Sequence, residues 1–140
     1  MILTNKTAGY SGTPLVKKLG IKEGFGCAII KSPAGFTELL GELPAAVTIS
    51  NSLKGKYDYI HFFTDSRTKL NKKFLLLKKA LDKNGMIWVS WPKKSSKITT
   101  DLTEDIIRET ALKNGLVDIK VCAVDETWSG LKLVYRLKDR

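Results

Sequence analysis

An uncharged run of bulky residues in the second half of the chain limits the choice of fold. It extends from Met86 to Trp91, follows Asn84-Gly85 and stops at Pro92, which has no amide to donate to a strand ladder. Six residues that are rich in bulky side chains and carry no charge are typical of a strand that is covered on both faces, as in a parallel sheet. We therefore predict a buried central strand that follows a helix end or turn at Asn84-Gly85 and runs into a basic, hydroxyl-rich loop.

Helices and strands alternate before this strand. We expect strands at 25–31, 46–50 and 57–63, and helices after Thr13-Pro14 (cap and first helical residue), at 36–40 and at 67–82. After it, Asp101-Leu102-Thr103-Glu104 matches a capping-box pattern and predicts a helix to Lys113. Alternating apolar residues at 117–123 and 131–138 then predict an antiparallel hairpin with one partly wet face. Residues 1–8 are expected to be flexible, and Gly9-Tyr10-Ser11-Gly12 is expected to form a turn.

This order of elements predicts a Rossmann-like α/β fold, with a mostly parallel sheet, helices on both faces and a C-terminal antiparallel hairpin. The 140 residues suit a single domain spanning 1–140. Cys27 and Cys122 lie in apolar runs, which favours small buried thiols in a cytoplasmic protein. No apolar run approaches the roughly 20 residues of a membrane-spanning helix, so we expect no membrane association.

The order of elements also carries a resemblance. The chain resembles a shortened S-adenosylmethionine-dependent methyltransferase fold. The matching features are a strand that opens with Tyr57-Asp58, a leucine-rich helix, Asn84-Gly85 before the next strand, and a final hairpin. The resemblance implies a sixth strand parallel to the others and a seventh that returns antiparallel between the fifth and the sixth, with an abbreviated first half. It also implies a glycine-rich turn after the first strand and an acid at the end of the second, which would hold the cofactor.

At finer grain the chain resembles a family of small bacterial proteins of unknown function. The matching segments are Gly9-Tyr10-Ser11-Gly12, Trp91-Pro92-Lys93-Lys94-Ser95-Ser96, Thr100 to Asp105, and Val121 to Lys132. The resemblance spans nearly the whole chain. It implies the same fold and supplies no chemistry.

Ligands of open α/β sheets bind outside the carboxyl ends of the parallel strands. Four segments are expected to meet there and to surround one cleft: 32–35, 64–67, 91–96 and 125–130. The candidate ligand-binding residues in them are Ser32, Gly35, Asp65, Trp91, Lys93, Lys94, Ser95, Ser96, Asp125, Glu126 and Trp128.

The cofactor signals are incomplete. The segment Ser32-Pro33-Ala34-Gly35 offers one glycine, and its proline removes a backbone donor. The second strand ends without a carboxylate, although Asn51 or Asp65 could substitute. S-adenosylmethionine is therefore a candidate cofactor that is not favoured. Lysines and hydroxyls of the 93–100 loop could instead bind phosphate, or form a solvated loop.

Two structural alternatives stay open. An ion pair of Asp125 or Glu126 with Lys93 or Lys94 would lock the two loops together without any ligand. His61, the only histidine, lies between apolar neighbours and is expected to be an interior residue rather than a general base. No spacing predicts a metal site, and the catalytic residues, if any, are unknown.

The charge balance favours an anionic partner. A net charge of +10 is compatible with an anionic small molecule or a nucleic acid. The favoured function is a non-catalytic binding or regulatory module with a degraded methyltransferase-like site. The alternatives are a small methyltransferase, with Asp125 or Glu126 near the transferred group, and a nucleic-acid-binding protein that uses the basic helix and the 93–97 loop. An exposed strand edge, left by the abbreviated first half, is also compatible with a homodimer.

Overall fold

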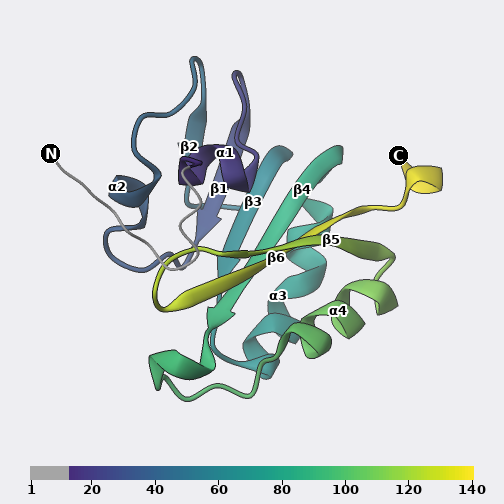
Figure 1. The fold of residues 1–140 in the computed structure, drawn as a ribbon. Coiled ribbons are helices and arrows are strands. Elements are labelled where there is room, and N and C mark those ends of the chain that lie inside the picture. Colours follow the sequence, from purple (N-terminus) through teal and green to yellow (C-terminus); the bar gives the residue numbers. More distant parts are fainter. Residues whose placement is uncertain (1–12) are drawn as a thin grey trace, which may run out of the picture.

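A six-stranded sheet forms the centre of the computed structural model, which describes residues 13–140 (Figure 1). Its spatial order is β2 (Thr48–Ser50), β1 (Gly26–Ile30), β3 (Tyr57–Phe63), β4 (Leu81–Pro92), β6 (Trp128–Tyr135) and β5 (Leu116–Ala123). The strands β2, β1, β3 and β4 are parallel, and β6 is antiparallel to both of its neighbours. The predicted mixed sheet is confirmed. The expectations for residues 1–8 and 9–12 lie outside the described residues.

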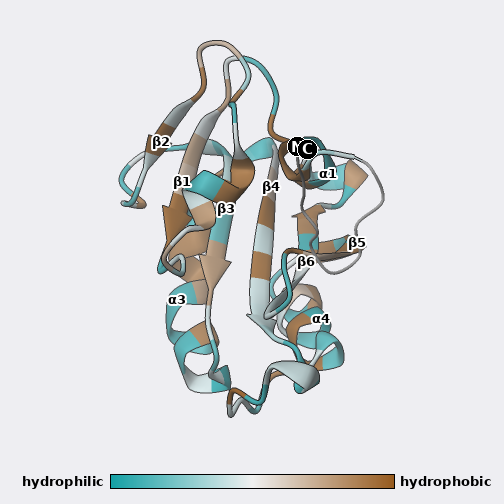
Figure 2. Cartoon of the chain, turned by 60° about the vertical axis from the view of Figure 1, so that its left-hand side comes forward, coloured by the Kyte–Doolittle hydropathy of each residue, from teal (hydrophilic) through white to brown (hydrophobic). Residues whose placement is uncertain are grey.

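Helices cover both faces of the sheet, as predicted. On one face lie α3 (Arg67–Lys79) and α4 (Glu104–Lys113), and on the other lie the short helices α1 (Leu15–Leu19) and α2 (Phe36–Leu40). Two 3-10 turns, η1 (Lys94–Ser96) and η2 (Leu137–Asp139), complete the elements. Hydrophobic and hydrophilic residues alternate along α3 and α4 because each helix buries one side only (Figure 2). None of the helices in residues 13–140 is long and apolar enough to cross a bilayer.

The central strand β4 begins earlier than predicted. The helix α3 ends at Lys79 rather than at residue 82, and Asn84-Gly85 lies inside β4 instead of forming a turn. The register shifts there, because Leu81 pairs with Tyr57 while Met86 pairs with Tyr59. A Cβ at Gly85 would lie 2.7 Å from the carbonyl oxygen of Asp58, so this glycine permits a close backbone approach at a bulge.

Two predicted helix starts are wrong. In α4 the N-cap is Thr103, whose Oγ1 accepts a hydrogen bond from the amide of Ile106 at 3.2 Å. The carboxylate of Asp101 instead accepts from the amide of Arg67 at 2.8 Å, so it caps α3 across space. In α1, Pro14 is itself the N-cap, and no side chain caps the helix.

The final hairpin is present with different boundaries. The strand β6 begins at Trp128 instead of Leu131, so the connecting loop is shorter than the predicted 125–130. A bulge between Asp118 and Lys120 changes the face of β5, and Ile119 and Val121 are exposed instead of inward. Leu137, expected in the second strand, lies in η2 and is exposed.

Candidate functional site: a lysine-lined pocket at the switch point

The direction of strand addition reverses between β1 and β3. From β1 the chain adds β2 on one side and then crosses to add β3 on the other. The loops that leave β1 and β3 therefore diverge at the carboxyl edge of the sheet. Such a switch point is the usual ligand position in open α/β sheets.

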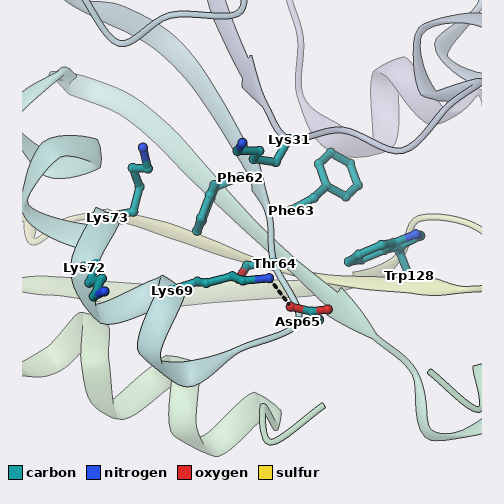
Figure 3. A pocket seen from close by; sticks show the side chains of 9 residues that line it. All are labelled: Lys31, Phe62, Phe63, Thr64, Asp65, Lys69, Lys72, Lys73 and Trp128. Atoms are coloured by element: carbon teal, nitrogen blue, oxygen red, sulfur yellow. Dashed lines mark hydrogen bonds and ion pairs between the residues drawn. The ribbon is translucent and has the colours of Figure 1, made fainter. Parts of the chain in front are cut away.

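A pocket lies at this switch point, with a volume of about 530 Å³. We call it the basic pocket (Figure 3), and its lining residues are Lys31, Phe62, Phe63, Thr64, Asp65, Lys69, Lys72, Lys73 and Trp128. Phe62 belongs to the core beneath α3 and α4, whereas Phe63 and Trp128 pack with the core of the opposite face. The basic pocket therefore straddles the end of the sheet.

Three of its lysines come from one helix face. Lys69, Lys72 and Lys73 are spaced i, i+3 and i+4 in α3, which turns them to one side while Leu70 and Phe74 enter the core. Lys69 forms an exposed ion pair with Asp65 at 3.1 Å. Among the described residues, no other lysine of the pocket has a carboxylate partner, so the lining carries a net charge of +3.

Lys31 reaches the pocket from the end of β1. Its backbone lies in the left-handed region, with φ at +61°, which is uncommon for a residue with a side chain. Trp128 lies across the pocket from α3, and its ring meets Phe63 edge-on, with ring centroids 5.3 Å apart. An ammonium cluster and an aromatic surface therefore share one hollow (Figure 3).

The predicted site residues divide among three hollows rather than one cleft. Asp65 and Trp128 line the basic pocket. Gly35, Asp125 and Glu126 line a second hollow of about 330 Å³ beside α2. Trp91 and Lys94 line a third, of about 370 Å³, against residues 100–104. The residues that line none of these three are Ser32, Lys93, Ser95 and Ser96.

The two tryptophans face opposite sides of the sheet because they come from adjacent register positions. Trp91 pairs with Ser129, whereas Trp128 pairs with Pro92. Trp91 is buried beside α4, and Trp128 is half-buried on the other side. The expectation that both rings surround one cleft is therefore wrong.

The loops after β4 and β5 are joined through the backbone. The amide of Lys93 donates to the carbonyl of Thr127 at 2.8 Å. The carboxylate of Asp125 accepts from the amides of Thr127 and Trp128, at 2.8 and 2.7 Å. The ion pairs of the described residues lie at Asp65 and around Arg108, so the alternative of an ion pair between Asp125 or Glu126 and Lys93 or Lys94 is not found. Ser96 donates to the carbonyl of Lys93 within its own turn.

A buried polar chain lies deeper in β3 and β4. His61 forms hydrogen bonds with the hydroxyl of Tyr59 at 2.8 Å and with that of Ser90 at 2.6 Å, and its ring stacks on Phe63. Burial lowers the pKa of His61 from 6.5 to about 3, so the ring is neutral. The prediction of an interior histidine is confirmed, as are the two buried thiols. Residues 13–140 contain no group of three or more metal-ligating side chains placed to hold an ion.

The signal for the lysines was present in the sequence. Lys69, Lys72 and Lys73 have helical spacing in the helix that follows a strand end, but such a charged helix face is most often only solvated. No sequence pattern predicts that Lys31 lines the pocket, because its position depends on a left-handed backbone conformation that the sequence does not indicate.

Comparison with solved structures defines the class: a methyltransferase-like Rossmann fold. A SAM-dependent methyltransferase from Aquifex aeolicus is 16% identical, with a TM-score of 0.58 over 85% of this chain and 86% of that one. Magnesium protoporphyrin IX methyltransferase from Synechocystis PCC 6803, with bound S-adenosylhomocysteine, is 13% identical, with a TM-score of 0.55 over 87% and 78%. A tRNA methyltransferase from B. subtilis is 13% identical, with a TM-score of 0.53 over 94% and 67%.

The chain belongs to the family described as "Protein of unknown function (DUF3052)", whose profile matches residues 56–137. The resemblance to the methyltransferase fold is therefore confirmed, and the resemblance to a family of unknown function is confirmed over residues 56–137. A comparison with curated proteins found no match. At these identities the similarity to the solved methyltransferases shows the fold alone.

Proposed function

We propose that the protein is a non-catalytic binding module that holds an anionic small molecule in the basic pocket. The observation that supports this function is the charge of the lining, where four lysines face one aspartate that is already paired. Like charges three and four residues apart on a helix repel each other, and an anion between them relieves that repulsion. A pocket at the switch point is also where this fold accepts ligands.

The residues that would hold S-adenosylmethionine do not fit it. After β1 the turn contains Pro33, which lacks an amide, and a single glycine, Gly35. A Cβ at Gly35 would meet no atom within 4 Å. This position therefore favours glycine because of its positive φ of +87°, and not because a side chain would fill a ligand-binding space. At the end of β2, Ser50 uses its hydroxyl in a local turn with Ser52, and no carboxylate follows.

The charge of the basic pocket gives a second argument. The cofactor's methyl group is carried on a positively charged sulfonium, which a lining of net charge +3 repels. Asp65, the one acid present, is paired with Lys69. These features favour an anion over the cofactor.

A small S-adenosylmethionine-dependent methyltransferase is the second candidate function. The observation in its favour is that solved proteins of the same fold contain bound S-adenosylhomocysteine or S-adenosylmethionine. Transfer of a labelled methyl group from S-adenosylmethionine to any component of a cell extract, dependent on this protein, would establish it.

Calorimetric titration separates the two candidates. The probes are S-adenosylmethionine, S-adenosylhomocysteine and inorganic pyrophosphate, each titrated into the wild type and into a Lys72→Ala/Lys73→Ala variant. We expect the wild type to bind pyrophosphate and the variant to lose this binding. We expect no heat of binding with S-adenosylmethionine or S-adenosylhomocysteine. Lys79→Ala is the matched control, because it removes one charge from the same helix at a position outside the basic pocket. Micromolar binding of S-adenosylmethionine that is lost in Trp128→Ala would instead return the protein to the methyltransferases.

A further inference from the structure

The positions of the lysines and of the Trp128 ring limit the chemical class of ligand that the basic pocket can bind. Resting on the function proposed above, we infer that this ligand is a nucleoside monophosphate. Its phosphate lies on Lys31, Lys72 and Lys73, and its base lies against Trp128. The inference rests on the arrangement of these side chains at the carboxyl edge of β1 and β3.

The lysines form one end of the pocket. In Figure 3, Lys72 and Lys73 project from α3 on one side, and the side chain of Lys31 extends toward that side from the end of β1. None of the three has a carboxylate partner among residues 13–140. A phosphate monoester offers a compact double negative charge and three acceptor oxygens, which suit flexible lysine side chains that reach one pocket from two elements.

The backbone of Lys31 is a second observation that points to a ligand. Outside glycine the left-handed region is sparsely populated, and residues held there cluster at ligand clamps and active sites. Lys31 adopts this conformation, with φ at +61°, directly after the last residue of β1. The conformation carries an ammonium group to the switch point, where the adjoining residues Ser32 and Pro33 offer no charge.

The opposite end of the pocket offers a fixed aromatic ring. Trp128 is only half-buried, yet both its ring and its backbone are held. Phe63 meets the ring edge-on at an interplanar angle of 84°, and the carboxylate of Asp125 binds the amide of Trp128. A ring that is rigid before binding loses little conformational freedom when a nucleobase stacks on it.

The size of the pocket favours a small molecule over a polymer. A volume of about 530 Å³ lies within the range of about 300–1,000 Å³ that is common for small-molecule sites. Proteins that bind single-stranded nucleic acid instead use extended grooves in which basic and aromatic side chains follow the backbone. Here the lysines line one hollow together with a single half-buried tryptophan ring.

Calorimetry with AMP, GMP, CMP and UMP, their nucleosides and inorganic phosphate tests the inference. We expect at least one nucleotide to bind about tenfold more tightly than both its nucleoside and inorganic phosphate, because only the nucleotide engages both ends of the pocket. The Lys72→Ala/Lys73→Ala variant loses about tenfold in affinity for nucleotide and phosphate, and the Lys79→Ala control retains both affinities. Trp128→Leu weakens nucleotide binding and leaves phosphate binding unchanged, with circular dichroism confirming that each variant is folded.

Three results would overturn the inference. If inorganic phosphate binds in a lysine-dependent way and no nucleotide binds more tightly, the base contact is wrong and the proposed anion-binding function stands. If neither phosphate nor any nucleotide binds, the proposed function fails as well. If a 5′-phosphorylated oligonucleotide binds about tenfold more tightly than every mononucleotide, the lysines belong to a nucleic-acid surface.

Discussion

Two regions along β3 use polar side chains in opposite ways. Inside the sheet, Tyr59, His61 and Ser90 are fully buried and hydrogen-bonded to one another. At the carboxyl end of the same strand, Lys72 and Lys73 line an open pocket without carboxylate partners in the described part of the chain. Buried polar groups persist only when they are paired. The buried hydrogen bonds of Tyr59, His61 and Ser90 therefore belong to the folded core, whereas the fold does not require a partner for the ammonium groups of Lys72 and Lys73.

The largest expected effect belongs to the buried chain. His61→Ala removes a ring that stacks on Phe63 and leaves the hydroxyls of Tyr59 and Ser90 without their partner. We expect the free energy of unfolding to fall by about 3–5 kcal/mol, from the cavity and the unpaired hydroxyls together. Chemical denaturation measures it, with Lys79→Ala as a surface control. A fall in the free energy of unfolding below about 1 kcal/mol would show that the hydrogen bonds of His61 with Tyr59 and Ser90 contribute no more than an ordinary surface residue.

The pH dependence of stability provides a second test of the buried His61. The pKa of His61 is about 3 in the folded protein against an ordinary value of 6.5, because burial disfavours the charged ring. The unfolded chain therefore binds the proton first, so stability is full above pH 6.5 and falls as the pH is lowered toward 3. The expected slope is about 1.4 kcal/mol per pH unit within that window. Denaturation of His61→Gln over the same range is the control, and an equal slope in both proteins would assign the effect to carboxylates.

The lysines are expected to behave in the opposite way. Removing two like charges from one helix face in Lys72→Ala/Lys73→Ala should leave stability within about 0.5 kcal/mol of the wild type, or raise it slightly at low salt. Thermal denaturation at low and high salt measures the difference. A loss above about 1 kcal/mol would mean that these side chains support the fold, and the contrast with the buried chain would then disappear.

The smallest expected effect concerns Asp65. Its ion pair with Lys69 joins two exposed groups 3.1 Å apart, so Asp65→Asn should change stability by less than about 1 kcal/mol. The same substitution raises the positive charge of the pocket, and phosphate affinity should increase by about two- to fivefold at low salt. Titration with inorganic phosphate tests this. Weaker binding would show that Asp65 orients Lys69 for the ligand.

Local patterns predicted much of the fold. The strand at 57–63 and the helix at 36–40 have the predicted boundaries, because each is a short segment rich in apolar or aromatic residues between clear turn residues. The parallel β5 and the inserted antiparallel β6 followed from the resemblance to methyltransferases. Features that depend on distant partners were missed. Gly85 faces the backbone of Asp58, and Asp101 caps a helix that begins 34 residues earlier.

The site was predictable as an edge of the sheet and not as a set of residues. Residues that follow β1 and β3, namely Lys31, Thr64 and Asp65, do line one pocket at the switch point. Which side chains share a hollow depends on the sheet face, and a single register position separates Trp91 from Trp128. The cytoplasmic location and the homodimer stay predictions.

The strand β6 follows every other strand in sequence but occupies an interior place in the sheet. The strands β4 and β5 do not pair with each other: β4 pairs with β3 on one side and with β6 on the other, whereas β5 is joined to the sheet through β6 alone. Until residues 128–135 insert, β4 presents an open row of backbone donors and acceptors, and β5 has no neighbour. An open strand edge is a template for pairing with another chain. Slow or failed docking of this single strand would thus divert the nascent molecule from folding toward aggregation.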